Sequence, residues 1–292
     1  MFKEKLENFW TKNYKWLMLI PIILLAISFV LIGVKYARTG DFLNKDVSLK
    51  GGIAATIDTD KQFSEEEIKQ ALGVEASIKT RTDTISRKNI GYIIEVSDLT
   101  DQELKEKIEK NLGIVITEKN YSQEETKPKL GEAFFKQLII ALIFAFILMG
   151  ITVFITFKTI APSIAVIFAA LTDIVITLAF TNIIGLSIST AGIVAFLLII
   201  GYSVDTDILL TNYAIKKREE KLFDRMFHSM KTGLTMTLCA CVVMLIGLIF
   251  STSEVITEMF IIILIALIVD MFSTYLTNAG ILWIYCKKKR IS

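Results

Sequence analysis

Four aspartates lie inside long apolar stretches of this 292-residue chain, and they are the side chains best suited to chemistry: Asp173, Asp205, Asp207 and Asp270. A charged carboxylate in the hydrocarbon of a bilayer costs about 2.5–3.5 kcal/mol on the insertion scale, so such residues usually mark an ion path or a partner contact. We predict that these aspartates relay protons. The sequence leaves a second interpretation open, in which they only hydrogen-bond neighbouring helices together or lie near frayed helix ends.

Asp205 and Asp207 point about 200° apart on a helix, so they cannot serve the same contact. Asp207 shares one helix face with Ser203 and Thr211, at intervals of four residues, and these hydroxyl groups offer a polar track. Helix geometry therefore favours Asp207 as the proton carrier and Asp205 as a partner-facing residue. Lys231, at the start of the next apolar stretch, lies at a comparable predicted depth and is expected to tune these carboxylates.

Two further polar stripes have helical spacing. They are Asp173 with Thr177, and Asp270 with Ser273, Thr274, Thr277 and Asn278. Stripes of this kind face the interior of a helix bundle or a water path, because lipid offers no hydrogen bonds. The sequence therefore predicts that polar groups from several spans point inward.

The sequence contains no enzyme signature. It has no phosphate-binding loop of the P-loop type, no HExxH and no nucleophile elbow. It also gives no sign of a cofactor or a metal, since the one histidine, His228, lies beside lysines, and the three cysteines fall in or next to apolar stretches. Any work must then draw on a partner or an ion gradient, and one charge crossing 100 mV carries about 2.3 kcal/mol.

We expect membrane helices to hold these aspartates, because 53% of the residues are hydrophobic. A helix needs about 20 apolar residues to cross a bilayer. Six stretches qualify: Trp16–Val34, Phe134–Phe157, Ile160–Asn182, Ile188–Tyr213, Gly233–Phe250 and Met259–Tyr285. The first is read as an uncleaved anchor, because no small-x-small cleavage site follows it.

Basic residues in the short loops predict the orientation. Lysines and arginines gather in the N-terminal tail, in the loop after the fourth span and in the C-terminal tail, whereas Thr181–Ser189 and Ser251–Thr257 contain none. We therefore expect a multi-pass protein of the cytoplasmic membrane with both termini in the cytoplasm and residues 37–132 outside. The net charge of +2 gives no indication of a nucleic-acid partner, because the charges are sorted by region of the chain.

Residues 37–132 have the composition of a soluble α+β domain of about 95 residues. Capping boxes begin predicted helices at Ser64 and Thr100, and the second helix is expected to end at Gly113. The predicted strands are Ile53–Ile57, Val74–Lys79, Ile90–Val96 and Ile114–Thr117. This β-α-β-β-α-β order is the ferredoxin-like pattern. The chain thus divides into a tail and first helix (1–36), an outer domain (37–132) and a five-helix bundle (133–292).

The fourth span carries the most specific motif, Gly201-Tyr202-Ser203-Val204-Asp205-Thr206-Asp207, followed by Lys216-Lys217-Arg218-Glu219. This stretch resembles the SecF family of protein-export membrane proteins. Leu171-Thr172-Asp173 and the segment 228–235 support the resemblance, as does the layout of six spans with one outer domain. The resemblance implies half of a transporter of the resistance-nodulation-division (RND) class, which pairs with SecD, associates with the SecYEG channel and uses the proton-motive force to draw polypeptide outward.

The sequence departs from the usual bacterial pattern at three places. Thr206 occupies the position of the family's proton-carrying aspartate, Lys231 replaces an arginine, and Leu49-Lys50 replaces an Asp-Phe pair. These departures suggest the archaeal branch. Two other functions stay open: a small proton-driven exporter of lipids or drugs, and a scaffold that stabilises SecD and the channel without conducting protons.

Overall fold

The structure is a computed structural model that describes residues 2–74, 76–82, 88–216, 220–251 and 253–291. Three residues of the predicted motif, Lys217, Arg218 and Glu219, and Glu75 of a predicted strand lie outside the described residues. The chain divides into two compact units. Lys45–Ile139 and Ser187–Thr190 form one unit, called here the outer unit, and the other segments form the helical unit.

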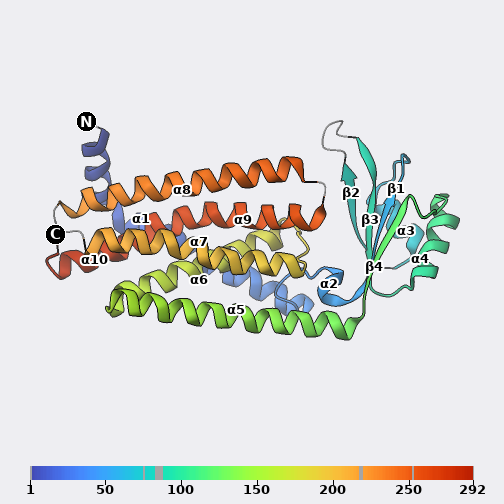
Figure 1. Cartoon of the computed structure of the whole chain (residues 1–292), viewed down its shortest axis with the longest axis horizontal. Coiled ribbons are helices and arrows are strands. Elements are labelled where there is room, and N and C mark those ends of the chain that lie inside the picture. Colours follow the sequence, from blue (N-terminus) through green and yellow to red (C-terminus); the bar gives the residue numbers. More distant parts are fainter. Residues whose placement is uncertain (1, 75, 83–87, 217–219, 252, 292) are drawn as a thin grey trace. The chain divides into compact units, whose positions relative to one another are not determined.

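Six helical runs in the described part of the chain are long and apolar enough to cross a membrane. They are α1 (Phe2–Thr39), α5 (Pro128–Phe157), α6 (Ile160–Ile183), α7 (Thr190–Ile215), α8 (Leu222–Phe250), and the continuous run of α9 (Glu254–Phe272), η2 (Ser273–Asn278) and α10 (Ala279–Lys288). Figure 1 shows α8 and α9 alongside each other, and α6 packs against α1 and α9. The six predicted spans are thus found as helices; α7 is shifted by two residues from its predicted bounds, and the other helices are longer than predicted.

The first helix shows the largest difference from the predicted bounds. The span was predicted from Trp16, but α1 begins at Phe2. The N-terminal tail has no glycine or proline before Pro21 and is rich in lysine, glutamate and leucine, which favour helix. The helix therefore continues through the charged tail.

Burial in the helical unit is uneven. Helices α6 and α7 are the most buried, whereas α5 and α8 expose many large apolar side chains, such as Phe144 and Val243. Large exposed apolar surfaces of this kind mark contact with lipid or with another protein. The polar residues of the predicted stripes lie on the buried sides of α6, α7 and α9.

The last membrane run is not a uniform α-helix. Six residues, Ser273–Asn278, form the π-helical segment η2 between α9 and α10. π-Helical segments are rare and often occur at functional sites. The spacing of polar residues predicted a continuous α-helix here; the structure has a π-helical segment instead, and the polar residues of the predicted stripe are still buried.

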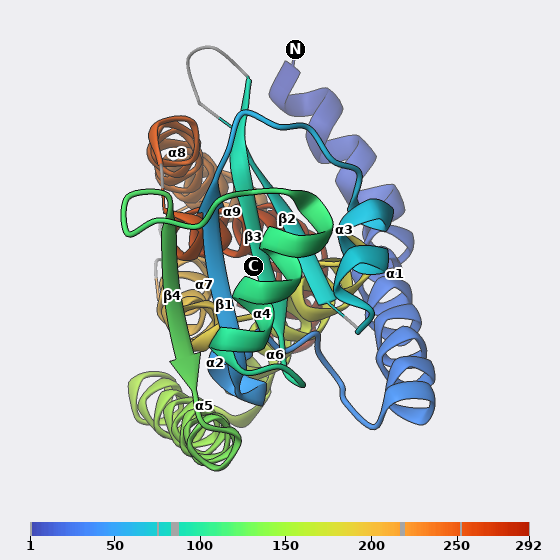
Figure 2. The ribbon, with the colours of Figure 1, turned by 90° about the vertical axis from the view of Figure 1, so that its right-hand side faces the viewer.

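The outer unit contains one four-stranded sheet, which Figure 2 shows with two helices in front of it. Its elements are β1 (Gly52–Asp58), α3 (Glu65–Leu72), β2 (Ala76–Thr82), β3 (Asn89–Val96), α4 (Asp101–Lys107) with η1 (Ile108–Leu112), and β4 (Tyr121–Thr126). The strand order is β2-β3-β1-β4, and every neighbouring pair is antiparallel. A short helix, α2 (Val47–Lys50), precedes the sheet.

Both predicted capping boxes are present. Ser64 accepts from the backbone N–H of Glu67, whose side chain accepts from the Ser64 backbone, and Thr100 and Glu103 repeat this arrangement. Gly113 ends the second helical segment in the left-handed conformation, as predicted. These local signals fix where the helices begin and end.

The last predicted strand was wrong. Residues 114–117 were expected to pair in the sheet, but the strand beside β1 is Tyr121–Thr126. Ile114 is buried in the core without belonging to a strand. The true edge strand is polar, so its pattern does not show the alternation of a half-buried strand.

The structure explains why position 52 is glycine, which the sequence alone did not. Its φ is +131°, and a Cβ there would lie 2.3 Å from the backbone oxygen of Val96. The close approach of β1 to β3 at this point therefore requires glycine.

Candidate site in the membrane helices

Three of the four membrane aspartates converge. Asp173 on α6, Asp207 on α7 and Asp270 on α9 are 0%, 0% and 3% exposed. Each belongs to a polar stripe that the sequence predicted to face inward, and their burial confirms that prediction. We call these three carboxyl groups, with the hydroxyl and amide groups that bond them, the carboxyl cluster.

Asp173 is held by two serine hydroxyls from different helices. Ser203 Oγ on α7 donates to Asp173 Oδ2 at 2.5 Å, and Ser273 Oγ in η2 donates to Asp173 Oδ1. Each carboxyl oxygen thus has its own donor. The bonds tie α6 to both α7 and η2.

Asp207 and Asp270 share a donor. Thr274 Oγ1 lies 2.9 Å from Asp207 Oδ1 and 3.1 Å from Asp270 Oδ1. Asn278 Nδ2 also donates to Asp207 Oδ1, at 2.6 Å. On the other side, Thr206 Oγ1 lies 3.1 Å from Asp270 Oδ2.

A threonine hydroxyl has one proton to donate and lone pairs to accept with. Thr274 can therefore donate to one carboxylate and accept from the other when that one is protonated. Thr206 meets one carboxyl group, that of Asp270, and also lies 2.8 Å from the backbone oxygen of Ser203. Its hydroxyl can donate to the Asp270 carboxylate, or donate to Ser203 and accept from a protonated Asp270. The cluster can rearrange its bonds as a proton changes place.

No positive charge balances the cluster within the described chain. Among the residues with described positions, no lysine, arginine or histidine forms an ion pair with Asp173, Asp207 or Asp270. Three buried carboxylates in one bonded network repel one another and lose hydration. Binding of a proton by one of them relieves both costs.

One carboxyl oxygen of the cluster and two hydroxyl oxygens of the same helices lack a hydrogen-bond partner among the described residues. Asp207 Oδ2 is buried without a partner among the described residues, and so is Thr211 Oγ1, one turn further along α7. Thr177 Oγ1 on α6 is a third such atom. Buried polar atoms are usually hydrogen-bonded. These three unpartnered oxygen atoms can therefore accept a proton that arrives at the site.

The cluster is not arranged as a metal centre. Within the described segments, no group of three or more His, Cys, Asp and Glu side chains is placed to hold a metal ion.

The other predicted site residues lie elsewhere. Asp205, Gly201 and Tyr202 are exposed on α7, and Lys231 is exposed on α8. Lys231 makes no ion pair with any aspartate in the described part of the chain. Its tuning role stays a prediction, and the lysine does not reach the carboxyl cluster within this chain.

Thr206 was predicted only as a departure from the family pattern, and no role in the site was predicted for it. Thr206 is 5% exposed and bonds to Asp270. Its position three residues after Ser203, on the same side of the helix, was a usable signal. The link between Thr274 and Asp207 depends on the packing of η2 against α7 and had no signal in the sequence.

Comparison with known proteins shows the family to which the chain belongs. The family described as protein export membrane protein SecD/SecF, C-terminal, matches residues 105–288. The protein-export membrane protein SecF of Methanocaldococcus jannaschii is 34% identical over 285 residues, which cover 96% of this chain and 98% of that protein. The chain belongs to the SecF family. The SecF of Pyrococcus furiosus is 30% identical over 295 residues, 99% of this chain and 97% of that one. These relatives are archaeal, as the sequence departures suggested.

A solved structure shows the same fold. The crystal structure of SecDF, a translocon-associated membrane protein from Thermus thermophilus, matches with a TM-score of 0.74 at 20% identity. The match covers 95% of this SecF-family chain and 38% of the SecDF chain. The chain therefore spans well under half of that protein.

Proposed function

We propose that the chain is an accessory subunit of the Sec protein translocase that couples the proton-motive force to polypeptide export. The observation that carries this is the carboxyl cluster, in which α6, α7 and α9 each contribute one buried aspartate and Thr274 bridges two of them. A proton that binds or leaves changes the bonds between three helices, so charge movement alters helix packing. The absence of enzyme signatures in the sequence is consistent with a gradient as the energy source.

The proposal gives the chain a partner. We propose that it pairs with SecD and acts with the SecYEG channel on translocating polypeptide, as half of an RND-class transporter. Asp205 and Lys231 support this, because ionisable side chains exposed on membrane helices are costly in lipid and have no ion-pair partner among the residues described. A second subunit that covers them supplies the missing contacts.

The outer unit is proposed to be a ferredoxin-like domain on the outer side of the membrane. The β-α-β-β-α-β element order and the β2-β3-β1-β4 antiparallel sheet support it. Both termini are then cytoplasmic, in agreement with the basic tails and with loops that lack lysine and arginine.

Export into inverted membrane vesicles that contain the chain, SecD and the channel tests the coupling. The measurement compares the preprotein export rate with and without a proton gradient. Asp207→Asn should abolish the stimulation by the gradient while membrane insertion and SecD binding persist, because asparagine keeps the shape but does not exchange a proton. Asp205→Asn is the matched control on the exposed face and should lose less. Full stimulation in both variants and in the double variant would favour the scaffold function.

A further inference from the structure

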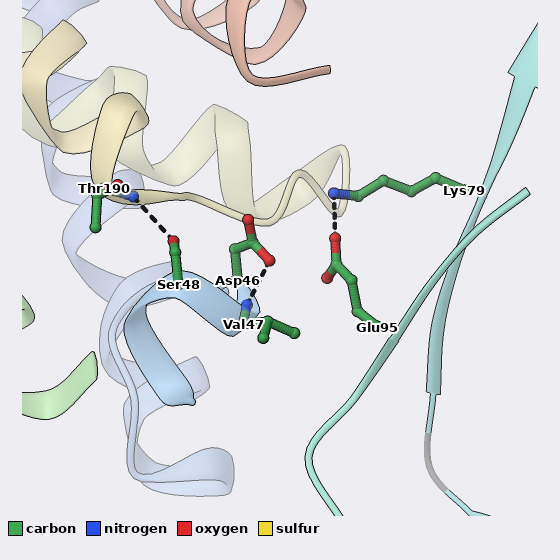
Figure 3. Close-up of polar contacts among 6 residues, drawn as sticks. All are labelled: Asp46, Val47, Ser48, Lys79, Glu95 and Thr190. Atoms are coloured by element: carbon green, nitrogen blue, oxygen red, sulfur yellow. Dashed lines mark hydrogen bonds and ion pairs between the residues drawn. The ribbon is translucent and has the colours of Figure 1, made fainter. Parts of the chain in front are cut away.

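One acidic side chain of the outer unit is buried on the side of the sheet away from its core. Glu95 lies on β3 between Ile94 and Val96, which belong to the core on the helix side. Alternation along a strand therefore points Glu95 to the opposite face. It is only 6% exposed, and Lys79 on β2 forms an ion pair with it at 2.6 Å. Figure 3 shows this pair at the right of the view.

A second carboxyl group faces Glu95. Figure 3 shows the carboxyl groups of Asp46 and Glu95 side by side, and the charge of Asp46 disfavours a charge on Glu95. Asp46 also caps α2, because its carboxylate accepts from the backbone N–H of Val47 (Figure 3). A hydrogen bond between two carboxyl groups needs one proton, so the contact exists in full only when one of the pair is neutral.

The segment around Asp46 also holds the start of a membrane helix. The Asp46 N–H donates to the backbone oxygen of Ile188 at 3.0 Å. Ser48 Oγ accepts from the N–H of Thr190 at 3.2 Å, as the dashed line in Figure 3 marks. Thr190 is the first residue of α7, and the first N–H groups of a helix have no partner within it. Ser48 therefore satisfies a group at the N-terminus of the helix that carries Ser203 and Asp207.

The charges around Glu95 are few. Asp46 and Lys79 are the charged groups that act on it, and the segment Ser187–Thr190 brings no titratable side chain. Lys45, next to Asp46, has its ammonium 4.4 Å from the ring centroid of Phe135. Glu124 on β4 lies in the same row of the sheet, because Ala54 pairs with both glutamates, but it is exposed.

We propose that Asp46 and Glu95 form a pH-sensitive latch that positions the first turn of α7 through α2 and Ser48. Burial, and then the charge of Asp46, raise the pKa of Glu95 to about 7, and Lys79 opposes the rise. Below that pH Glu95 is neutral and bonds Asp46. Above it Glu95 is charged and retains its ion pair with Lys79. The charge of Glu95 then repels Asp46, and α2 moves with Asp46. The latch goes beyond the proposed proton relay, since it acts on the helix end whether or not Asp207 carries a proton.

Hydrogen exchange at the start of α7 tests the latch directly, because Ser48 bonds the Thr190 amide. The full chain in lipid nanodiscs is exchanged at several pH values from 5.5 to 8.5, and the peptide that contains Thr190 is followed by mass spectrometry. The ratio of the wild-type rate to the rate of Glu95→Gln at the same pH cancels the chemical pH dependence of exchange. We expect a ratio near one at pH 5.5 that rises at least about threefold above pH 7.5.

Three variants separate the latch from a general loss of structure. Glu124→Gln, the matched control in the same sheet row, should follow the wild type. Asp46→Asn keeps a capping side chain for α2 but removes the repulsion, so its exchange, relative to that of Glu95→Gln, should show no rise above pH 7.5. Ser48→Ala should exchange fast at every pH and lose the dependence. The proposal is overturned if the ratio of the wild-type rate to the Glu95→Gln rate stays at one across the pH range. It is also overturned if the Asp46→Asn profile is identical to that of the wild type. Lys79→Met, which should move the rise to higher pH, serves if Glu95→Gln fails to fold.

Discussion

The hydroxyl oxygen of Thr274 lies 2.9 Å from Oδ1 of Asp207, on a different helical run. The same hydroxyl reaches Asp270 at 3.1 Å, so it connects two buried carboxyls of the cluster. A proton that moves between them changes the direction of this one hydrogen bond. The arrangement makes Thr274 as informative a target as the aspartates themselves.

Thr274→Val keeps the shape of the side chain and removes its hydroxyl. We expect it to abolish most of the gradient-dependent export, because hydrogen bonds to charged groups contribute about 1.5–3 kcal/mol and both carboxyls lose one. Thr277→Val is the matched control, since that buried hydroxyl donates to the backbone oxygen of Met18 and touches no carboxyl. Export into inverted vesicles, with and without the gradient, measures both. Equal stimulation in the two variants would contradict the role of Thr274.

The second prediction concerns stability and pH in the outer unit. The pKa of Glu95 rises from 4.5 to about 7 on folding, so the folded state binds the proton more tightly. The contribution of this group is therefore fully present below pH 4.5 and is lost as the pH rises through 7, by up to about 3 kcal/mol in all. Glu95→Gln should remove this part of the pH dependence.

Pulse proteolysis of the full chain in urea, from pH 4.5 to 8.5, measures it as the unfolding of the outer unit. The wild type should lose stability relative to Glu95→Gln over this range, whereas Glu124→Gln should follow the wild type. Parallel curves for wild type and Glu95→Gln would show that Glu95 is not neutral in the folded protein at low pH.

Local signals made most of the fold predictable. The two capping boxes place the N-terminal ends of α3 and α4 within a few residues, because their hydrogen bonds join residues that are three positions apart. Apolar length alone identified the six spans. The edge strand Tyr121–Thr126 was missed because its pairing with β1 depends on residues about 70 positions away, while the apolar residues near Ile114 serve the core from a loop.

The candidate site was predictable only in part. Burial of Asp173, Asp207 and Asp270 follows from helical spacing and the cost of charge in lipid. Which groups hydrogen-bond to each other could not be predicted, because the contacts join different helices. Thr206 and Asp270 are 64 residues apart in the sequence, and Asp207 and Thr274 are 67 apart. The depth argument for Lys231 gave its height along the bundle but not the face of α8 on which it lies.

The third prediction tests the orientation. Single cysteines are introduced at Glu65 in the outer unit and at Glu220 before α8, both exposed, with Cys239, Cys241 and Cys286 replaced by alanine. A membrane-impermeant maleimide applied to sealed cells should label position 65 and leave position 220 unlabelled until the membrane is opened. The reverse pattern would place the outer unit in the cytoplasm and contradict the expectation from the basic loops.

The fourth prediction uses two glycines of the bundle. A Cβ at Gly233 on α8 would lie 1.9 Å from the hydroxyl of Tyr275, whereas one at Gly201 on α7 would meet nothing within 4 Å. Tyr275 is buried in η2 directly after Thr274, so Gly233→Ala pushes on the segment that bonds Asp207. We expect Gly233→Ala to destabilise the chain by about 1–3 kcal/mol, as overpacking does, and to reduce gradient-dependent export.

Gly201→Ala gives the opposite result in the isolated chain. Alanine favours helix over glycine by up to about 1 kcal/mol, and no neighbour has to move, so thermal stability in detergent should stay equal or rise. Gly201 shares the exposed face of α7 with Asp205, where a small residue permits another helix to approach closely. Copurification with SecD should therefore weaken in Gly201→Ala although the chain itself is no less stable. Unchanged stability of Gly233→Ala would show that Tyr275 moves aside without a cost in free energy of unfolding. Normal SecD binding by Gly201→Ala would show that the exposed face of α7 is not part of the partner interface.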